Sequence, residues 1–390
     1  MRRLCTLLGL PQHRFASIHV VGTNGKTSVA RMTAALLDAH GIRAGAYLSP
    51  HIHDWRERVV IAGEPIAAAA FAEALERTEE KARIADRGAG EDGPVTQFEL
   101  VTAAAFLALA NARVKLGVIE AGLGGRLDAT NVIPSRATVL TSVGLDHTEW
   151  LGETLAEIAA EKLDVLRDRT VLVRGELPPE ADAVAEAAVR RHHARMLGPA
   201  PLEGLPVSGL APYQRANLGL ALRAAAEIAG ELRAEAVGAA VASLSIPGRA
   251  QVITGDPPLI VDAAHNADGA RALAAALPEL GGGPVVCCTA VLEGKDAASI
   301  AAALAPHCAH VVSTEVPEAA IAAGGRPGGR SVPASELAAL FAAEGVEAEA
   351  VQDRERALER ALAVGRDRSL PVLVTGSHFL LGSALAAADG

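Results

Sequence analysis

Lys26, Thr27 and Ser28 follow a glycine-bearing loop, and together they could bind the phosphates of a nucleotide. The loop Gly22–Gly25 comes after the apolar run Ile18–Val21 and directly before an apolar-periodic helical segment. In such a strand–loop–helix unit, backbone N–H groups and the helix N-terminus face a polyanion, the lysine reaches the β- and γ-phosphates, and a hydroxyl can ligate magnesium. We therefore expect a nucleotide site formed by Thr23, Asn24, Gly25, Lys26, Thr27 and Ser28.

The spacing of this loop departs from the general GxxxxGK[ST] pattern. Val20 stands where that pattern has its first glycine. A plain strand–turn–helix without a ligand is therefore the alternative interpretation of the segment.

A carboxylate and an imidazole are expected beside this loop. Glu120 ends the apolar run Leu116–Glu120, and His147 follows the run Thr138–Val143. The carboxyl ends of parallel strands meet at one edge of a sheet, where open α/β proteins bind their ligands. The pair predicts a divalent-metal site. A hydrogen-bonded structural role is the alternative for His147.

Lys162 is one of only five lysines in the chain. It falls four residues after Ile158, on the stripe of its helix that should face inward. Burial favours the neutral amine, which can react with carbon dioxide to form a carbamate, whereas a guanidinium stays protonated. An exposed lysine paired with Glu161 or Asp164 is the alternative.

The elements that must position these groups alternate between strands and helices. The alternation predicts an α/β fold with a mostly parallel sheet covered on both faces. Thr96–Glu99 and Thr154–Glu157 are capping boxes that begin two helices. Ser245–Arg249 reads as a linker, after which the alternation restarts. Further strands are expected near Leu259–Asp262, Pro284–Ala290, His310–Thr314, Glu347–Val351 and Pro371–Thr375.

Composition limits the classes of partner. The formal net charge of -10 argues against nucleic acid. Apolar runs are too short to cross a bilayer, and the N-terminal residues lack the pattern of an export signal, so we expect no membrane partner and a cytoplasmic protein. The four cysteines lack metal-ligand spacing and are expected to be reduced.

The order of these segments resembles the folylpolyglutamate synthase/dihydrofolate synthase family, within the Mur ligase superfamily. The resemblance extends from the first residues to Gly382. The segments that carry it are Gly22–Ser28, Ser49–His51, Glu57-Arg58, Thr96–Glu99, Glu120–Asn131, Gly144–Thr148, Glu161-Lys162, Pro247–Arg249, Asp262–Asn266 and Gly376-Ser377.

The resemblance implies an ATP-dependent ligase that joins the carboxylate of a folate or dihydropteroate to the amino group of L-glutamate through an acyl phosphate. It implies a P-loop ATP-binding domain over residues 1–245 and a smaller, Rossmann-like, glutamate-binding domain over residues 246–390. It also implies ATP, two Mg²⁺ sites and a carbamylated Lys162 as cofactors, and a monomer. ATP is expected to bind across the two domains.

The resemblance also assigns residues by position. Implied catalytic residues are Lys26, Glu120, His147, Lys162 and His265. Implied metal ligands are Ser49 and Glu120 at one magnesium ion and Glu120, His147 and Lys162 at a second. Thr27 is not part of the family pattern, but its hydroxyl is the one seen in general P-loops, and we expect it to be an additional magnesium ligand. Implied nucleotide contacts outside the loop are Asn217, Arg249 and Asp262. Implied substrate contacts are Gln97, Phe98, Leu127, Asp128 and Ala129 for the pterin, and His265 and Ser377 for glutamate.

Some residues depart from the family pattern. Thr27 replaces a glycine, Arg56 replaces an asparagine, and Glu161–Val165 reads Glu-Lys-Leu-Asp-Val where Glu-Lys-Ala-Gly-Ile is usual. Another Mur-type amide ligase with a different carboxylate substrate remains open at this point, and so does a P-loop nucleotide switch without ligase chemistry.

Overall fold

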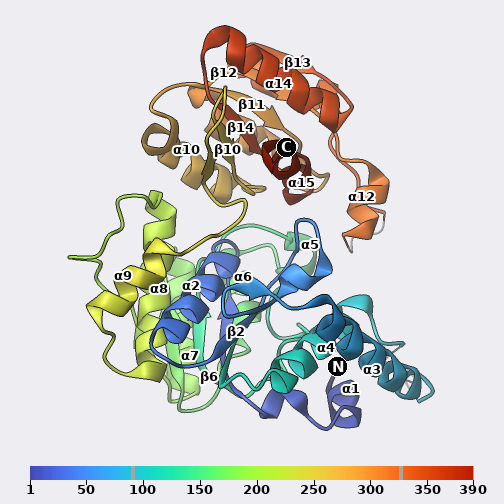
Figure 1. Ribbon diagram of the computed structural model, residues 1–390, viewed down its shortest axis with the longest axis vertical. Helices are drawn as coiled ribbons and strands as arrows, with labels where there is room; N and C mark the ends of the chain where they lie inside the picture. The colour runs from blue at the N-terminus through green and yellow to red at the C-terminus, as the bar shows by residue number, and fades with distance from the viewer. Residues whose placement is uncertain (89–92, 325–327, 390) are drawn as a thin grey trace. The chain divides into compact units, whose positions relative to one another are not determined.

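The computed structural model describes residues 1–88, 93–324 and 328–389 of the chain (Figure 1). The chain divides into two compact units. Unit 1 comprises Met1–Gly209 and Gln214–Leu244, and unit 2 comprises Leu210–Tyr213 and Ser245–Gly390. The main division therefore lies between Leu244 and Ser245.

Unit 1 is built on an eight-stranded sheet with the strand order β4-β3-β2-β5-β1-β6-β7-β8. The central strand β1 pairs in parallel with β5 on one side and β6 on the other. Only β3 and β4 run antiparallel to their neighbours. The strands are β1 Ala16–Val21, β2 Ala44–Tyr47, β3 Val59–Ile61, β4 Glu64–Pro65, β5 Leu116–Glu120, β6 Ser135–Leu140, β7 Val171–Arg174 and β8 Arg195–Leu197.

Helices cover both faces of this sheet, as the sequence predicted (Figure 1). Both predicted capping boxes are confirmed: Thr96 and Thr154 accept hydrogen bonds from the N–H groups of Glu99 and Glu157, whose carboxylates bond back to the cap. The helices are α1 Arg2–Leu7, α2 Lys26–Ala39, α3 Ala68–Asp86, α4 Gln97–Asn111, α5 Thr148–Leu151, α6 Leu155–Leu163, α7 Pro179–Arg191, α8 Pro212–Ala229 and α9 Ala234–Ala242, with short 3₁₀ turns at Pro11–His13 and Trp55–Arg58.

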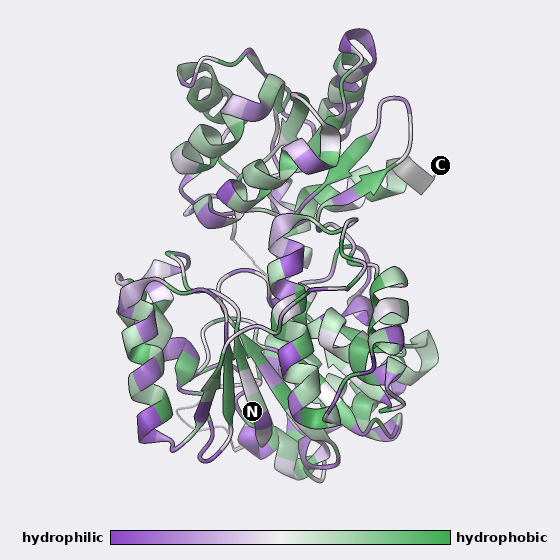
Figure 2. Ribbon diagram, turned by 90° about the vertical axis from the view of Figure 1, so that its left-hand side faces the viewer, coloured by the Kyte–Doolittle hydropathy of each residue, from purple (hydrophilic) through white to green (hydrophobic). Residues whose placement is uncertain are grey.

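Two clusters of buried apolar residues pack against one face of this sheet. One lies around α4, whose residues 101–109 are all buried, and it includes Phe15, Tyr47 and Phe106. The other surrounds α6 and includes Leu140 and Ile158. Apolar residues dominate the strands, and hydrophilic residues lie along the outer surfaces of the helices (Figure 2). Apolar burial thus anchors this face of the sheet, and Ile18, Val20 and Val118, which alternate with these residues along the strands, are buried on the other face.

Unit 2 contains a six-stranded sheet with the order β13-β12-β11-β14-β10-β9, in which only β9 is antiparallel. Cys287 and Cys288 are buried, unbridged thiols in β11, as expected. The strands are β9 Gln251–Ile253, β10 Leu259–Val261, β11 Val285–Thr289, β12 Cys308–Ser313, β13 Ala348–Ala350 and β14 Val372–Thr375. The helices are α10 Ala267–Gly281, α11 Ala297–Leu304, α12 Glu318–Ala323, α13 Ala334–Ala343, α14 Arg354–Arg368 and α15 His378–Asp389, with a 3₁₀ turn at Ala305–His307.

One predicted strand is displaced. The expected strand Thr138–Val143 is observed as Ser135–Leu140, because Thr141 and Ser142 leave the sheet and hydrogen-bond to Asn24 of the glycine loop. Strands β3, β4, β8 and β9 were not predicted. Within the described residues, no helix is both long and apolar enough to cross a membrane.

Candidate functional site

The glycine loop between β1 and α2 is packed too closely for larger residues. Gly22 and Gly25 have φ values of 150° and 84°. A Cβ on Gly22 would lie 1.9 Å from Thr141 Oγ1, and a Cβ on Gly25 would lie 2.5 Å from Asn217 Oδ1. Both positions therefore require glycine. The same contact places Asn217, from α8, directly against the loop.

The loop is also fixed by hydrogen bonds to the segment that follows β6. The hydroxyl of Thr23 accepts from Gly144 N at 3.0 Å, and Asn24 N donates to Ser142 Oγ at 2.9 Å. Lys26, the first residue of α2, donates to the carbonyl oxygens of Gly22 at 3.0 Å and Thr23 at 3.1 Å. The lysine is thus held over the loop at the N-terminus of a helix, where an anion is stabilised.

Glu120 lies at the C-terminal end of β5 with only 1% of its surface exposed. Its two carboxylate oxygens accept from Thr27 Oγ1 at 3.0 and 3.1 Å, and Oε2 also accepts from Ser49 N at 3.0 Å. The structure therefore brings together three of the residues predicted to bind metal, from α2, from β5 and from the loop after β2. Carboxylate and hydroxyl oxygens are ligands that Mg²⁺ accepts.

Lys162 is buried on α6, with 3% exposure. Its Nζ donates to Gly22 O at 3.1 Å, so the two amine groups of Lys162 and Lys26 share one carbonyl oxygen. Burial and the charge of Lys26 lower the pKa of Lys162 to about 7, against the opposing effect of the carboxylates of Asp146, Asp128 and Glu161. The alternative of an exposed helix lysine is wrong.

His147 lies at the N-terminus of α5 in a left-handed conformation, with φ of 52°. Its backbone N donates to Asp146 Oδ1 at 2.9 Å, and its Nε2 is 3.8 Å from the same oxygen. Within the described part of the chain, no three His, Cys, Asp or Glu side chains form a group that could hold a metal ion. The assignment of His147 as a metal ligand therefore stays a prediction.

The loop after β5 is held together by Asp128. Its carboxylate accepts from Leu123 N at 2.8 Å and from Thr130 N at 2.9 Å, and it also bonds the Thr130 hydroxyl. Burial raises the pKa of Asp128. Because several of its bonds are made within the loop, this side chain has a structural role in addition to the substrate contact that was predicted for it.

The other predicted pterin residues have different surroundings. The Phe98 ring lies against Gly122, where a Cβ would come within 2.3 Å of the ring. Leu127 is 86% exposed, Gln97 is exposed at the start of α4, and Ala129 is buried. The structure therefore joins Phe98 to the loop after β5, and an apolar side chain of that loop faces solvent.

Unit 2 groups its own predicted residues at the C-terminal ends of β10 and β14. Asp262 accepts from Ala250 N and Ala264 N, both at 2.8 Å, and Gly376 N donates to Ala264 O at 2.9 Å. His265 Nδ1 is 2.9 Å from Ala263 O, and Ser377 is buried after β14. Arg249 bonds the carbonyl of Gly248 at 2.9 Å. His265 and Ser377 therefore lie near neighbouring strand ends.

Several residues of these sites were not singled out from the sequence. Tyr213 donates its hydroxyl to Asp262 Oδ2 at 2.5 Å, and burial raises its pKa. His19, in the middle of β1, bonds the Thr130 hydroxyl through Nε2 at 2.8 Å, and burial lowers its pKa to about 3. Asp146 could have been found, since it adjoins His147; the partners of Tyr213 and His19 are distant in sequence and left no local signal.

Comparison with known proteins adds an independent line of evidence. The family model described as Mur ligase, glutamate ligase domain, matches residues 248–378. The dihydrofolate synthase/folylpolyglutamate synthase of Mycobacterium tuberculosis is 37% identical over 83% of this chain and 77% of its own length. The folylpolyglutamate synthase of Lacticaseibacillus casei is 32% identical over 97% of this chain and 92% of its own length.

Solved structures show the same likeness. The M. tuberculosis folylpolyglutamate synthase complexed with ADP and AMPPCP has a TM-score of 0.90 and 31% identity, covering 100% of this chain and 94% of its own. E. coli FolC with DHPP and ADP has a TM-score of 0.83 and 26% identity, at 100% and 93% coverage. A bifunctional folylpolyglutamate synthase/dihydrofolate synthase with Mn, AMPPNP and L-glutamate bound has a TM-score of 0.84 and 29% identity, at 100% and 94% coverage.

Proposed function

The chain belongs to the folylpolyglutamate synthase/dihydrofolate synthase family, and from that premise we propose that it is an ATP-dependent ligase joining the carboxylate of a folate or dihydropteroate to L-glutamate. The observation that carries the proposal is the group around Glu120, in which Thr27 and the backbone of Ser49 bond one buried carboxylate beside Lys26. A nucleotide loop, a lysine and oxygen ligands for a divalent cation are what phosphoryl transfer requires.

Unit 1 would activate the acid. A carboxylate oxygen of the substrate attacks the γ-phosphorus of ATP, the bond to the β,γ-bridging oxygen breaks, and ADP leaves. Lys26, Asn24 and the N-terminus of α2 hold the phosphates and offset the charge that develops on the transferred group. Magnesium, when bound, neutralises further phosphate charge. Thr27, Glu120 and Ser49 would hold that ion, because their oxygen donors suit it.

Unit 2 would supply the amino acid. His265 and Ser377 are proposed to hold L-glutamate, and we propose that Arg249, Asp262 and, from unit 1, Asn217 contact the nucleotide. The glutamate nitrogen attacks the carbonyl carbon of the acyl phosphate, an amide bond forms, and inorganic phosphate leaves while the amine gives up its proton. The domain roles follow: ATP binding for residues 1–245 and glutamate binding for residues 246–390.

Lys162 is proposed to be carbamylated in the active enzyme. Its nitrogen is buried and lies beside Lys26 across a shared carbonyl oxygen, and both conditions favour the neutral amine. That neutral amine forms a bond to the carbon of carbon dioxide and releases one proton, so a buried neutral group becomes an anion. The carbamate, Glu120 and His147 would then hold a second magnesium ion.

The pterin is proposed to lie against Phe98 and the loop after β5, with Gln97, Leu127, Asp128 and Ala129 around it. The exposed apolar surface of Leu127 and the ring of Phe98 support this placement, because pterins are flat and partly apolar. We further propose that the enzyme acts as a monomer in the cytoplasm.

One assay tests the proposed function. ADP release is measured with dihydropteroate, tetrahydrofolate or methylenetetrahydrofolate, each with and without L-glutamate. Turnover that needs both a pterin acid and glutamate supports the proposal and identifies which of the two activities is present. ADP release that is indifferent to both would instead indicate a nucleotide switch, and turnover only with another acid would indicate a different Mur-type ligase.

A further inference from the structure

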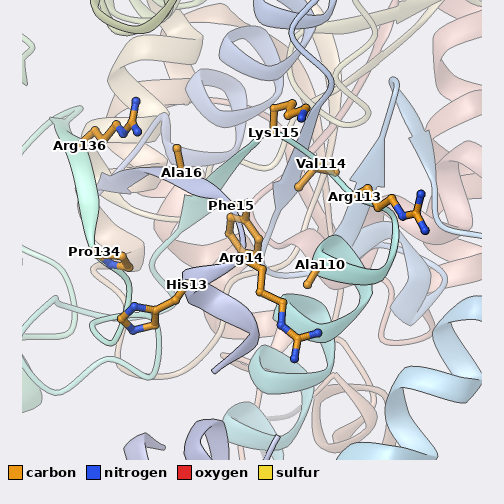
Figure 3. A pocket seen from close by; sticks show the side chains of 10 residues that line it. All are labelled: His13, Arg14, Phe15, Ala16, Ala110, Arg113, Val114, Lys115, Pro134 and Arg136. Carbon is orange, nitrogen blue, oxygen red and sulfur yellow. The ribbon is translucent and has the colours of Figure 1, made fainter. Parts of the chain in front are cut away.

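A pocket of about 520 Å³ opens where β1, β5 and β6 begin (Figure 3). The glycine loop and Glu120 lie after the C-terminal ends of the same strands, so the pocket is at the opposite edge of the sheet. Among its ten lining residues are Arg14, Arg113, Lys115 and Arg136, together with His13, and none is acidic.

The cations of this pocket lack acidic partners. Within the described residues, the side chains of Arg113, Lys115 and Arg136 form no hydrogen bond or ion pair, and Arg14 donates only to the carbonyl of Gly9, at 3.2 Å. This is unexpected in a chain with 46 acidic and 36 basic residues. Like charges gathered around a concavity repel one another and attract an anion into it.

Some exposed arginines elsewhere in the chain do form ion pairs. Arg195 bonds Glu227 at 2.6 Å, and Arg368 bonds Glu347 at 2.6 Å. What sets the pocket apart is that three arginines and a lysine line one hollow with no acidic residue among the lining residues.

The backbone that presents these cations is irregular at two points. Ser17 pairs with Ser135, whereas the next residue, Ile18, pairs with Ala137, so Arg136 is an extra residue in β6 and forms a bulge. A bulge redirects the side chain that it carries. Arg113 has a φ of 56°, a left-handed conformation that is uncommon for arginine.

The pocket rests on rigid elements. Ala16 N donates to Lys115 O at 3.1 Å, and Lys115 N donates to Arg43 O at 2.8 Å. Phe15, a buried lining residue, contacts Phe106, with 6.4 Å between the ring centroids. Because the strand starts are fixed, the backbone that carries the cations keeps its position without a ligand.

We propose that this pocket binds a small polyanion that carries several phosphate or carboxylate groups, at a site separate from the ATP, folate and glutamate sites. Guanidinium groups bind either kind of anion through paired N–H donors, and the lysine adds a point charge. Because no acidic residue lines the pocket, a ligand with several negative charges is favoured over one with a single charge. The volume of the pocket limits the ligand to a compact molecule.

The test is calorimetric titration of the whole chain with sodium tripolyphosphate and, separately, with citrate, in EDTA at about physiological salt. The wild type is compared with Lys115→Gln/Arg136→Gln. A matched control, Arg77→Gln/Arg191→Gln, removes two exposed charges from α3 and α7. Binding at the glycine loop is common to all three proteins and cancels in the comparison.

We expect at least one anion to bind the wild type and to lose about tenfold or more in affinity in the pocket variant, with the control within about twofold. Binding of tripolyphosphate alone identifies a phosphate ligand, and binding of citrate alone identifies a carboxylate ligand. Equal affinity in the wild type and the pocket variant, or an equal loss in the control, overturns the proposal. Arg113→Asn, which suits the left-handed backbone, provides a second variant with the same expectation.

Discussion

Replacing Lys162 by methionine should stabilise unit 1 and remove part of its pH dependence. The pKa of this buried amine is lowered from 10.5 to about 7, first by burial and then by Lys26. Between these two values the unfolded chain binds a proton that the folded chain does not, so the free energy of unfolding rises with pH. Below about pH 7 both states are protonated, and the full cost of a buried charge is present.

The size of the effect follows from the two pKa values. Linkage gives a gain of about 2 kcal/mol in the free energy of unfolding between pH 7 and 9 for the wild type. Methionine has a similar length and no charge, and it loses the hydrogen bond to Gly22 O. We therefore expect Lys162→Met to be more stable than the wild type by roughly 3 kcal/mol at pH 7, with the difference shrinking toward pH 9.

Urea unfolding followed by tryptophan fluorescence measures this difference, because Trp55 and Trp150 are the only tryptophans and both belong to unit 1. The buffer contains EDTA and is free of carbon dioxide. Lys81→Met, which removes a lysine from the surface of α3, serves as the control. A stability difference between the wild type and Lys162→Met that stays constant from pH 7 to 9 would refute the reasoning. Added bicarbonate should then stabilise the wild type and leave Lys162→Met unchanged, if the carbamate forms.

Four other changes test the site. Lys26→Ala should lower kcat by about 10²–10³-fold while the circular dichroism spectrum stays unchanged, since its bonds are to loop carbonyls; normal turnover at saturating ATP would contradict the P-loop assignment. Thr27→Val should raise the magnesium concentration for half-maximal activity roughly tenfold, whereas Thr27→Ser keeps the hydroxyl and should behave as the wild type. Gly25→Ala should weaken nucleotide binding, measured by titration with AMPPNP, because its Cβ would collide with Asn217; an unchanged Kd would count against it. Lys162→Ala should lose ligase rate far more than ATP affinity, and partial rescue by small carboxylates such as acetate would distinguish a missing metal ligand from a packing defect.

Local patterns made much of unit 1 predictable. The strand–loop–helix around Gly22 and the two capping boxes depend on residues that are close in sequence, so their types and spacing were sufficient. The burial of Lys162 followed from its helical spacing to Ile158. That it shares a carbonyl oxygen with Lys26 could not be predicted, because Gly22 is 140 residues away and only the packed sheet brings them together.

Other features depended on tertiary contacts throughout. Strands β3, β8 and β9 are short segments stabilised by their pairing partners in the sheet, and they were missed. The strand β6 was predicted three residues too late, also because of a tertiary contact. Thr141 is a residue type typical of strands, but its hydroxyl donates to the carbonyl of Asn24, which is distant in sequence. The bulge at Arg136 is invisible in the sequence, since it exists only in the register between two strands.

The hydrogen bond between His19 and Thr130 ties the loop after β5 to β1, the strand that also carries the glycine loop. The strand ends directly in the glycine loop, and from its middle it fixes the Thr130–Asp128 end of the loop after β5. With its pKa lowered to about 3, His19 stays neutral over the physiological range, so this link does not loosen with pH. A small shift of β1 would therefore move the glycine loop and the loop after β5 in the same direction. The distance between the two loops would be preserved. The buried His19 thus keeps the two loops in a fixed position relative to each other, and its loss would let that position vary.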